Sequence, residues 1–195
     1  VLQGVSFHIN PRETVAFVGS TGSGKSTILS LICRNYEFQK GEILIDGIDI
    51  RKIKISSLRR HFGQMLQDVF LFIDKLDHGL DEEVRERGNN FSAGQRQLLS
   101  FARTIIHKPS VMILDEATAN IDTETEALIT SALAKLMEGR TTIMVAHRLS
   151  TIRDADLILV MKDGDIIEQG RHEELLAAGG FYANLYNSQF EDVVA

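Results

Sequence analysis

The sequence has few of the residues that define several common classes of protein. Its 195 residues include one cysteine, Cys33, which excludes an internal disulfide and a cysteine-rich metal site. A lone cysteine is most often a small buried hydrophobe, and a reduced compartment such as the cytosol fits this usage. The net charge is -6 at pH 7, so the bulk charge does not favour a nucleic-acid-binding surface.

Long hydrophobic runs and a secretory signal are also missing. No apolar run reaches the ~18 residues that a membrane-spanning helix needs. The chain begins with Val1 rather than an initiator methionine. We therefore expect it to be a piece of a longer protein.

The chain alternates between β-branched apolar runs and helix-like patterns. Strands are expected at residues 13–19, 110–117 and 140–147, and helices at 25–35 and 123–137. This alternation predicts an α/β fold, a mostly parallel sheet with helices on both faces.

Shorter patterns predict smaller elements. Residues 2–10 and 41–50 resemble short antiparallel strands, and "KDG" at 162–164 is a good turn for a hairpin. Residues 172–190 form a helical pattern that Gly179 and Gly180 interrupt.

A complete phosphate-binding motif lies between the first predicted strand and the helix that follows it. Its glycines let backbone N–H groups turn toward phosphate oxygens, and the start of the helix adds a positive dipole end. We expect Lys25 to reach the β- and γ-phosphates and Ser26 to bind Mg²⁺. The residues assigned to nucleotide binding are Gly19, Ser20, Thr21, Gly22, Ser23, Gly24, Lys25, Ser26 and Thr27.

An acidic pair ends the predicted strand "VMILDE". We expect Asp115 to hold Mg²⁺ and Glu116 to polarise the attacking water as a general base. The alternative is a solvated strand end, which the upstream phosphate loop makes less favourable.

Two further polar residues are candidates for the same site. Gln67 could contact the metal or the attacking water, although a surface glutamine is the simpler interpretation. His147 ends a strand expected beside that of Asp115, so it should face the same crevice, where it could bond the γ-phosphate and orient Glu116. A purely structural histidine is its alternative.

A second glycine motif, "FSAGQRQ" at 91–97, has no lysine. Ser92, Gly94 and the first N–H groups of the following helix would form an anion site, with Gln95 beside them. A helix capped by Ser92 explains part of this pattern but not the Ala-Gly-Gln that follows it.

These motifs together resemble the ATP-binding cassette (ABC) ATPases, and in particular the nucleotide-binding domain of an exporter. "GSTGSGKST" resembles the Walker A motif, "VMILDE" the Walker B motif, "LQDVFLF" the Q-loop and "VAHRLST" the H-loop. "FSAGQRQ" resembles the signature motif, and "ATANID", with Asp122, the D-loop. The resemblance covers residues 1–195 and implies a P-loop NTPase core, a small antiparallel β subdomain and a helical subdomain.

The resemblance also implies partners and a location. Two such domains would pair head to tail, each signature helix facing the ATP on the other's P-loop, with Asp122 at the seam. A transmembrane domain of the same chain would hold the domain at the cytoplasmic face of a membrane. The alternatives are an ABC ATPase without membrane segments and a regulatory module without turnover.

The sequence departs from the family pattern in three places. The signature has Phe91 and Ala93 where leucine and glycine are usual, which suggests a heterodimer with one weaker site, a homodimer being the alternative. Gln67 and Ser92 stand too close together, so most of the helical subdomain is expected to be missing, with a gap near 72–75. The aromatic residue that stacks on adenine would precede Val1.

Overall fold

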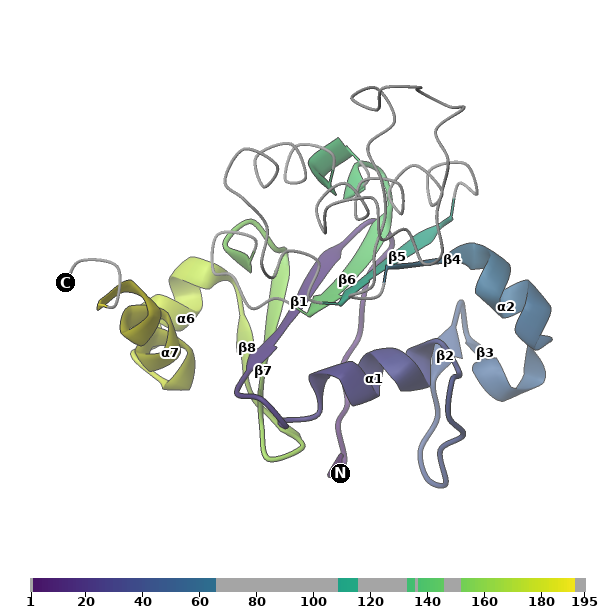
Figure 1. Cartoon of the computed structure of the whole chain (residues 1–195), viewed down its shortest axis with the longest axis horizontal. Helices are drawn as coiled ribbons and strands as arrows, with labels where there is room; N and C mark the ends of the chain where they lie inside the picture. Colours follow the sequence, from purple (N-terminus) through teal and green to yellow (C-terminus); the bar gives the residue numbers. More distant parts are fainter. Residues whose placement is uncertain (1, 66–108, 116–132, 136, 146–151, 192–195) are drawn as a thin grey trace, which may run out of the picture.

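The structure, a computed structural model, describes residues 2–65, 109–115, 133–135, 137–145 and 152–191. Within these ranges a six-stranded sheet runs through the centre of the molecule (Figure 1). Its strand order is β4-β5-β6-β1-β7-β8, and all neighbouring pairs are parallel except β7 and β8. The predicted α/β fold with a mostly parallel sheet is confirmed.

The strands of this sheet are short and rich in β-branched and other apolar residues. They are β1 (Thr14–Gly19), β4 (Phe62–Met65), β5 (Val111–Asp115), β6 (Thr141–Val145), β7 (Leu157–Lys162) and β8 (Asp165–Gly170). Successive side chains point to opposite faces of a strand, so a strand covered on both faces needs a continuous apolar run. In β1 the residues from Val15 to Val18 are all buried.

The two faces of the sheet carry two separate apolar clusters. Val15 and Phe17 pack on the face covered by α1 (Lys25–Ile32). Ala16 and Val18 pack on the other face, where α6 (His172–Ala178) and α7 (Phe181–Glu191) contribute buried residues. The expected coverage of both faces is therefore present.

The C-terminal helices meet at the break expected at Gly179 and Gly180. Gly179 ends α6 in the left-handed conformation, with φ of 65°. Glu168 of β8 then accepts hydrogen bonds from the N–H groups of Phe181 and Tyr182, at 2.5 and 2.9 Å. Its carboxylate satisfies free donors at the start of α7 and fixes this helix to the sheet.

A small peripheral unit follows α1. It contains the antiparallel hairpin of β2 (Leu44–Ile45) and β3 (Ile48–Asp49), the 3₁₀ helix η1 (Ile50–Lys52) and α2 (Ile55–His61). The predicted antiparallel β subdomain at 41–50 is confirmed, although its strands are only two residues long.

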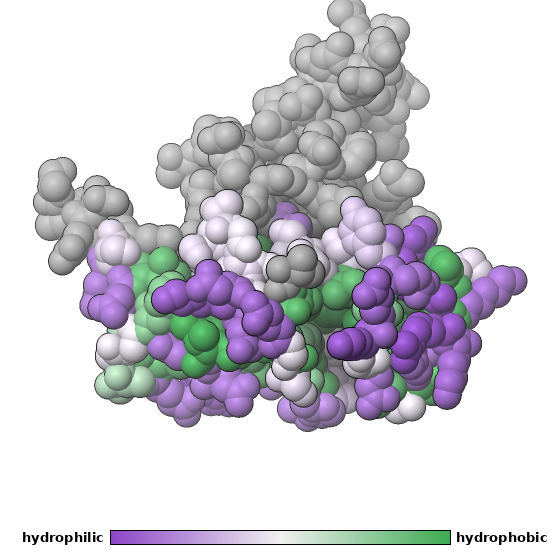
Figure 2. Space-filling model, turned by 90° about the horizontal axis from the view of Figure 1, so that it is seen from below, coloured by the Kyte–Doolittle hydropathy of each residue, from purple (hydrophilic) through white to green (hydrophobic). Residues whose placement is uncertain are grey.

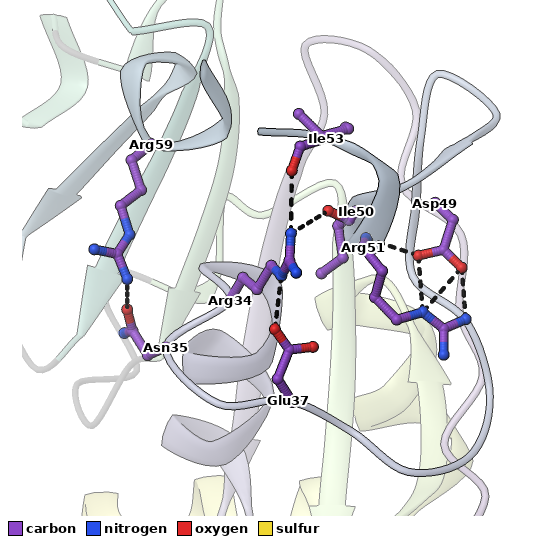
Figure 3. Close-up of polar contacts among 8 residues, drawn as sticks. All are labelled: Arg34, Asn35, Glu37, Asp49, Ile50, Arg51, Ile53 and Arg59. Atoms are coloured by element: carbon purple, nitrogen blue, oxygen red, sulfur yellow. Dashed lines mark hydrogen bonds and ion pairs between the residues drawn. The ribbon is translucent and has the colours of Figure 1, made fainter. Parts of the chain in front are cut away.

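Arginine side chains hold this peripheral unit to the end of α1 (Figure 3). Arg34 donates to the carbonyl oxygens of Ile50 and Ile53, both at 3.1 Å, and pairs with Glu37 at 2.9 Å. The side chain of Arg51 folds back onto Asp49 and lies over the ring of Phe38, 4.6 Å from its centroid. The contacts of Arg34 link separate segments, whereas Asp49 and Arg51 are two residues apart.

The N-terminal segment departs from the sequence prediction. Residues 2–10 were expected to form an antiparallel strand, but they contain no strand residue. The apolar side chains of this segment nevertheless face the core: Leu2, Val5, Phe7 and Ile9 pack against the apolar cluster between α1 and the sheet. The prediction was wrong because the apolar period of two reflects this packing and not a ladder of backbone hydrogen bonds.

Most of the exposed large apolar residues of the described part lie in or beside the peripheral unit. The exposed residues of this kind are Tyr36, Leu44, Ile48, Ile55 and Ile167. Seen from below, hydrophobic residues show in small patches between hydrophilic ones (Figure 2). None of the helices in the described ranges has the length and apolar content that a bilayer crossing requires.

Candidate nucleotide-binding site

The predicted phosphate loop joins the end of β1 to the start of α1. β6 and β7 flank β1, β5 lies next to β6, and all of these strands run parallel to β1, so their carboxyl ends meet the loop at one edge of the sheet. Ligands of open α/β sheets bind at this edge. The sheet thus brings the phosphate loop and Asp115, the last residue of β5, to the same place.

Two glycines give the loop its shape. Gly19 has φ of 151°, and a methyl group added there would overlap the carbonyl oxygen of Met161 on β7. Gly24 has φ of 104° and forms the N-cap of α1. Other residues rarely adopt these conformations, so the glycine spacing of the motif follows from the backbone path.

Lys25 lies within the loop that precedes it. Its side chain is only 5% exposed, and Nζ donates to the carbonyl oxygens of Gly19 and Ser20, at 2.8 and 2.9 Å. The hydroxyl of Ser23 is 3.4 Å from the same nitrogen. A positive charge therefore sits inside a turn of backbone, the arrangement that binds phosphate oxygens.

Ser26 and Asp115 come together from distant parts of the sequence. The hydroxyl of Ser26 donates to the Oδ1 atom of Asp115 at 3.4 Å. Both residues offer oxygen atoms, and Mg²⁺ is bound by one or two such protein ligands together with phosphate oxygens and water. These two oxygen ligands fit the Mg²⁺ ion that the sequence predicted.

The remaining residues of the loop are described, and several predicted site residues are not. Ser20, Thr21, Gly22, Ser26 and Thr27 are exposed, so this side of the loop is accessible. Outside the described residues lie Gln67, Ser92, Gly94, Gln95, Glu116, Asp122 and His147. Their predicted roles are untested by the structure.

One contact of the loop was missed at the level of sequence. The amide of Gly164, in the turn between β7 and β8, donates to the carbonyl oxygen of Ser23 at 3.2 Å. "KDG" indicated a turn there, and this hairpin is confirmed. The position of the turn beside the phosphate loop depends on the strand register, which a single sequence does not give.

A comparison with protein-family models matches the ABC transporter family at residues 2–77 and 72–119. The chain belongs to the ABC transporter family. It is an exporter-type nucleotide-binding domain with a P-loop α/β fold.

Relatives of this ABC domain match it along nearly its whole length. It is 48% identical to the ABC transporter ATP-binding protein exp8 of Streptococcus pneumoniae, over 97% of this chain and 38% of that protein. It is 42% identical to the ATP-dependent lipid A-core flippase of Methylobacillus flagellatus, over 95% of this chain and 38% of the flippase. The chain thus spans less than two fifths of the length of these relatives.

A solved structure shows the same fold. The ATP-bound structure of a bacterial Atm1-family ABC exporter superposes with a TM-score of 0.88, at 39% identity. The match covers 96% of this chain and 38% of that exporter chain.

Proposed function

We propose that this ABC domain binds ATP with Mg²⁺, hydrolyses it, and drives export through a transmembrane domain of a longer chain. The observation that carries the proposal is the loop around Lys25, with Ser26 and Asp115 in hydrogen-bond contact beside it. Family membership supports the same activity.

The described residues would act mainly by binding and orienting ATP. Lys25 would exchange its bonds with loop carbonyl oxygens for bonds with the β- and γ-phosphates. Ser26 and Asp115 would hold Mg²⁺, which when bound neutralises charge on the phosphates. Glu116 follows Asp115 directly and would take a proton from the attacking water, and His147 would bond the γ-phosphate and orient Glu116. Gln67 would contact the metal or this water.

A second nucleotide-binding domain would complete the site. Ser92, Gly94 and Gln95 would bind the ATP held by the partner's P-loop, and Asp122 would lie at the seam between the domains. The methyl group of Ala93, where the family has glycine, would weaken this contribution. A heterodimer is favoured for this reason, in which the P-loop described above forms the stronger site with an intact signature from the partner.

Residues 1–195 would form one ABC domain with an internal gap near 72–75, where a block of a few dozen residues is absent. The two family-model matches overlap at residues 72–77, which supports a break in the pattern at this place. The alignment with exp8 runs over 220 positions, more than the 195 residues of the chain. A helical subdomain that lacks part of its usual length accounts for both observations.

The membrane location is part of the proposal. The relatives include a protein named as a lipid A-core flippase and a multidrug resistance ATP-binding/permease protein. An exporter domain at the cytoplasmic face of a membrane fits these relatives better than an ABC ATPase without membrane segments.

Two substitutions test binding and hydrolysis separately. Lys25→Ala should raise the Kd for ATP at least about tenfold, because bonds to a charged donor contribute roughly 1.5–3 kcal/mol. Glu116→Gln should keep ATP binding and lower the rate of phosphate release by about 100-fold or more. Binding is measured by titration with ATP and Mg²⁺, and turnover by released phosphate.

Exposed residues of the same type provide the controls. Lys40→Ala and Glu138→Gln change exposed side chains and should leave both quantities unchanged. Full turnover in Glu116→Gln would remove Glu116 from the role of base. Unchanged ATP affinity in Lys25→Ala would contradict the proposed site.

A further inference from the structure

The turn between β7 and β8 is tied to the phosphate loop and to the N-terminal segment at once. The N–H group of Gly164 donates to the carbonyl oxygen of Ser23 at 3.2 Å. The carbonyl oxygen of Gly164 accepts a hydrogen bond from the N–H group of Gln3 at 2.8 Å. In Figure 1 the tip of this hairpin lies at the lower end of the sheet, next to the loop that follows β1.

The strand register explains why the turn reaches the loop. Gly19, the last residue of β1, pairs with Met161 of β7. β7 continues for one more residue, Lys162, before the chain turns at Asp163 and Gly164. The turn therefore stands beyond the end of β1, where the phosphate loop begins.

The loop packs closely against this support. A methyl group at Gly24 would stand 2.9 Å from Cδ2 of Leu2 and 3.8 Å from Cα of Gly164. At Gly19 a methyl group would overlap the carbonyl oxygen of Met161. The loop therefore lies close against β7, and the hydrogen bond between Gly164 and Ser23 ties it to the turn.

Ser23, whose carbonyl oxygen accepts the hydrogen bond from Gly164, also contacts Lys25. Its N–H group donates to the carbonyl oxygen of Ser20 at 3.2 Å, and its hydroxyl lies 3.4 Å from Nζ of Lys25. Ser23 is 3% exposed. The position of the Gly164 amide thus affects the curve of the loop and the place of the lysine within it.

We propose that Gly164 is a positioning residue for ATP binding, acting through the Ser23 carbonyl oxygen without contacting the nucleotide. The inference rests on the proposed ATP binding by the loop. The required feature is the backbone conformation of Gly164, with φ of 87°, and not a side chain. Both central residues of the turn have positive φ, as a type I′ turn requires.

The chain offers a matched control in its other Asp-Gly hairpin. Asp46 and Gly47, between β2 and β3, have φ of 50° and 76°, against 51° and 87° for Asp163 and Gly164. A methyl group at Gly47 would meet no atom within 4 Å. The same substitution therefore strains both turns, but only one of them supports the phosphate loop.

The test compares Gly164→Val, Gly164→Asn and Gly47→Val. For each, the Kd for ATP with Mg²⁺ is measured by titration, and the thermal midpoint is measured without nucleotide. Both valine variants should lower the midpoint, because valine rarely adopts positive φ. Gly164→Val should also raise the Kd about tenfold, whereas Gly47→Val should leave it unchanged. Gly164→Asn should lie between wild type and Gly164→Val, since asparagine tolerates this conformation.

Each outcome is decisive. Equal ATP affinity in Gly164→Val and Gly47→Val would overturn the positioning role. If Gly164→Val does not fold, Gly164→Asn decides: wild-type ATP affinity at a lowered thermal midpoint would overturn the role. If the unmodified chain does not bind ATP, the proposed function itself fails, a result distinct from the other two.

Discussion

Two regions of the molecule use the same Asp-Gly turn in different surroundings. Gly47 turns the peripheral hairpin in open space, and Gly164 turns the β7–β8 hairpin against the phosphate loop. The local sequence produces the same conformation in both places. The neighbouring strands decide whether a turn only reverses the chain or also supports a binding site.

The wider regions differ in the same way. The edge that carries the phosphate loop is held by backbone hydrogen bonds and by close approach of glycines to β7. The peripheral unit is held to the end of α1 by the side chain of Arg34, whereas Arg51 pairs with Asp49 of the same unit (Figure 3). Backbone contacts leave little room for substitution, whereas long side chains on a surface can adjust. The expected effects of substitution therefore decrease from the first region to the second.

The largest effect is expected at Gly19. Gly19→Ala would place its methyl group on the carbonyl oxygen of Met161, and neither backbone can move without disturbing the β1–β7 ladder. We expect a loss of about 3 kcal/mol or more in the free energy of unfolding, measured by urea denaturation. Gly22→Ala is the control, since Gly22 has open space around it and only the strain of positive φ, roughly 1–2 kcal/mol. Similar losses in both variants would show that β7 does not constrain the loop.

An intermediate effect is expected at Arg34. Arg34→Ala removes charge-assisted bonds to the carbonyl oxygens of Ile50 and Ile53, so unfolding should become easier by about 2 kcal/mol. Arg51→Ala removes the ion pair with Asp49, two residues away, and the contact with the Phe38 ring, and should destabilise the fold less than Arg34→Ala does. Chemical denaturation of both variants checks the order. The reverse order would mean that the Asp49–Arg51 pair, and not Arg34, holds the peripheral unit.

The smallest effect is expected from the protonation of Asp49, which makes the free energy of unfolding depend on pH. Side-chain and backbone hydrogen bonds from Arg51 lower the pKa of Asp49 from 3.8 to about 2. Because the pKa of Asp49 is lower in the folded state than in the unfolded state, its ionised carboxylate stabilises the fold at pH values above about 4. This contribution is lost as the pH falls from about 4 to about 2. The free energy of unfolding of Asp49→Asn should therefore vary less with pH in this window than that of the wild type. An unchanged pH slope in Asp49→Asn would contradict the contribution of this carboxylate.

The central part of the fold was predictable from the sequence because the core strands are apolar on both faces. The runs around Val15–Val18 and Val111–Asp115 could be buried only in a covered sheet. Asp163-Gly164 and Gly179-Gly180 marked local breaks whose cause lies in the glycine itself. The positions of these elements can be predicted without knowing which distant residues are in contact.

The predictions were wrong or incomplete where contacts between residues distant in the sequence determine the structure. Residues 2–10 have the alternation of a strand but pack on the core without forming one. The contact between Gly164 and Ser23 depends on the pairing of Gly19 with Met161. In the candidate site, Ser26 and Asp115 lie in hydrogen-bond contact, and their roles as Mg²⁺ ligands stay predictions. The predicted catalytic pair, Glu116 and His147, stays a prediction.

The burial of Cys33, predicted from its isolation in the sequence, has a practical consequence. The thiol is 2% exposed at the end of α1, and burial raises its pKa to about 11. Alkylating reagents attack the thiolate, so at neutral pH they should reach this sulfur only while α1 is lifted from the sheet. Because the sequence has no other cysteine, the rate of mass increase under alkylation reports the opening of this one helix without an engineered label.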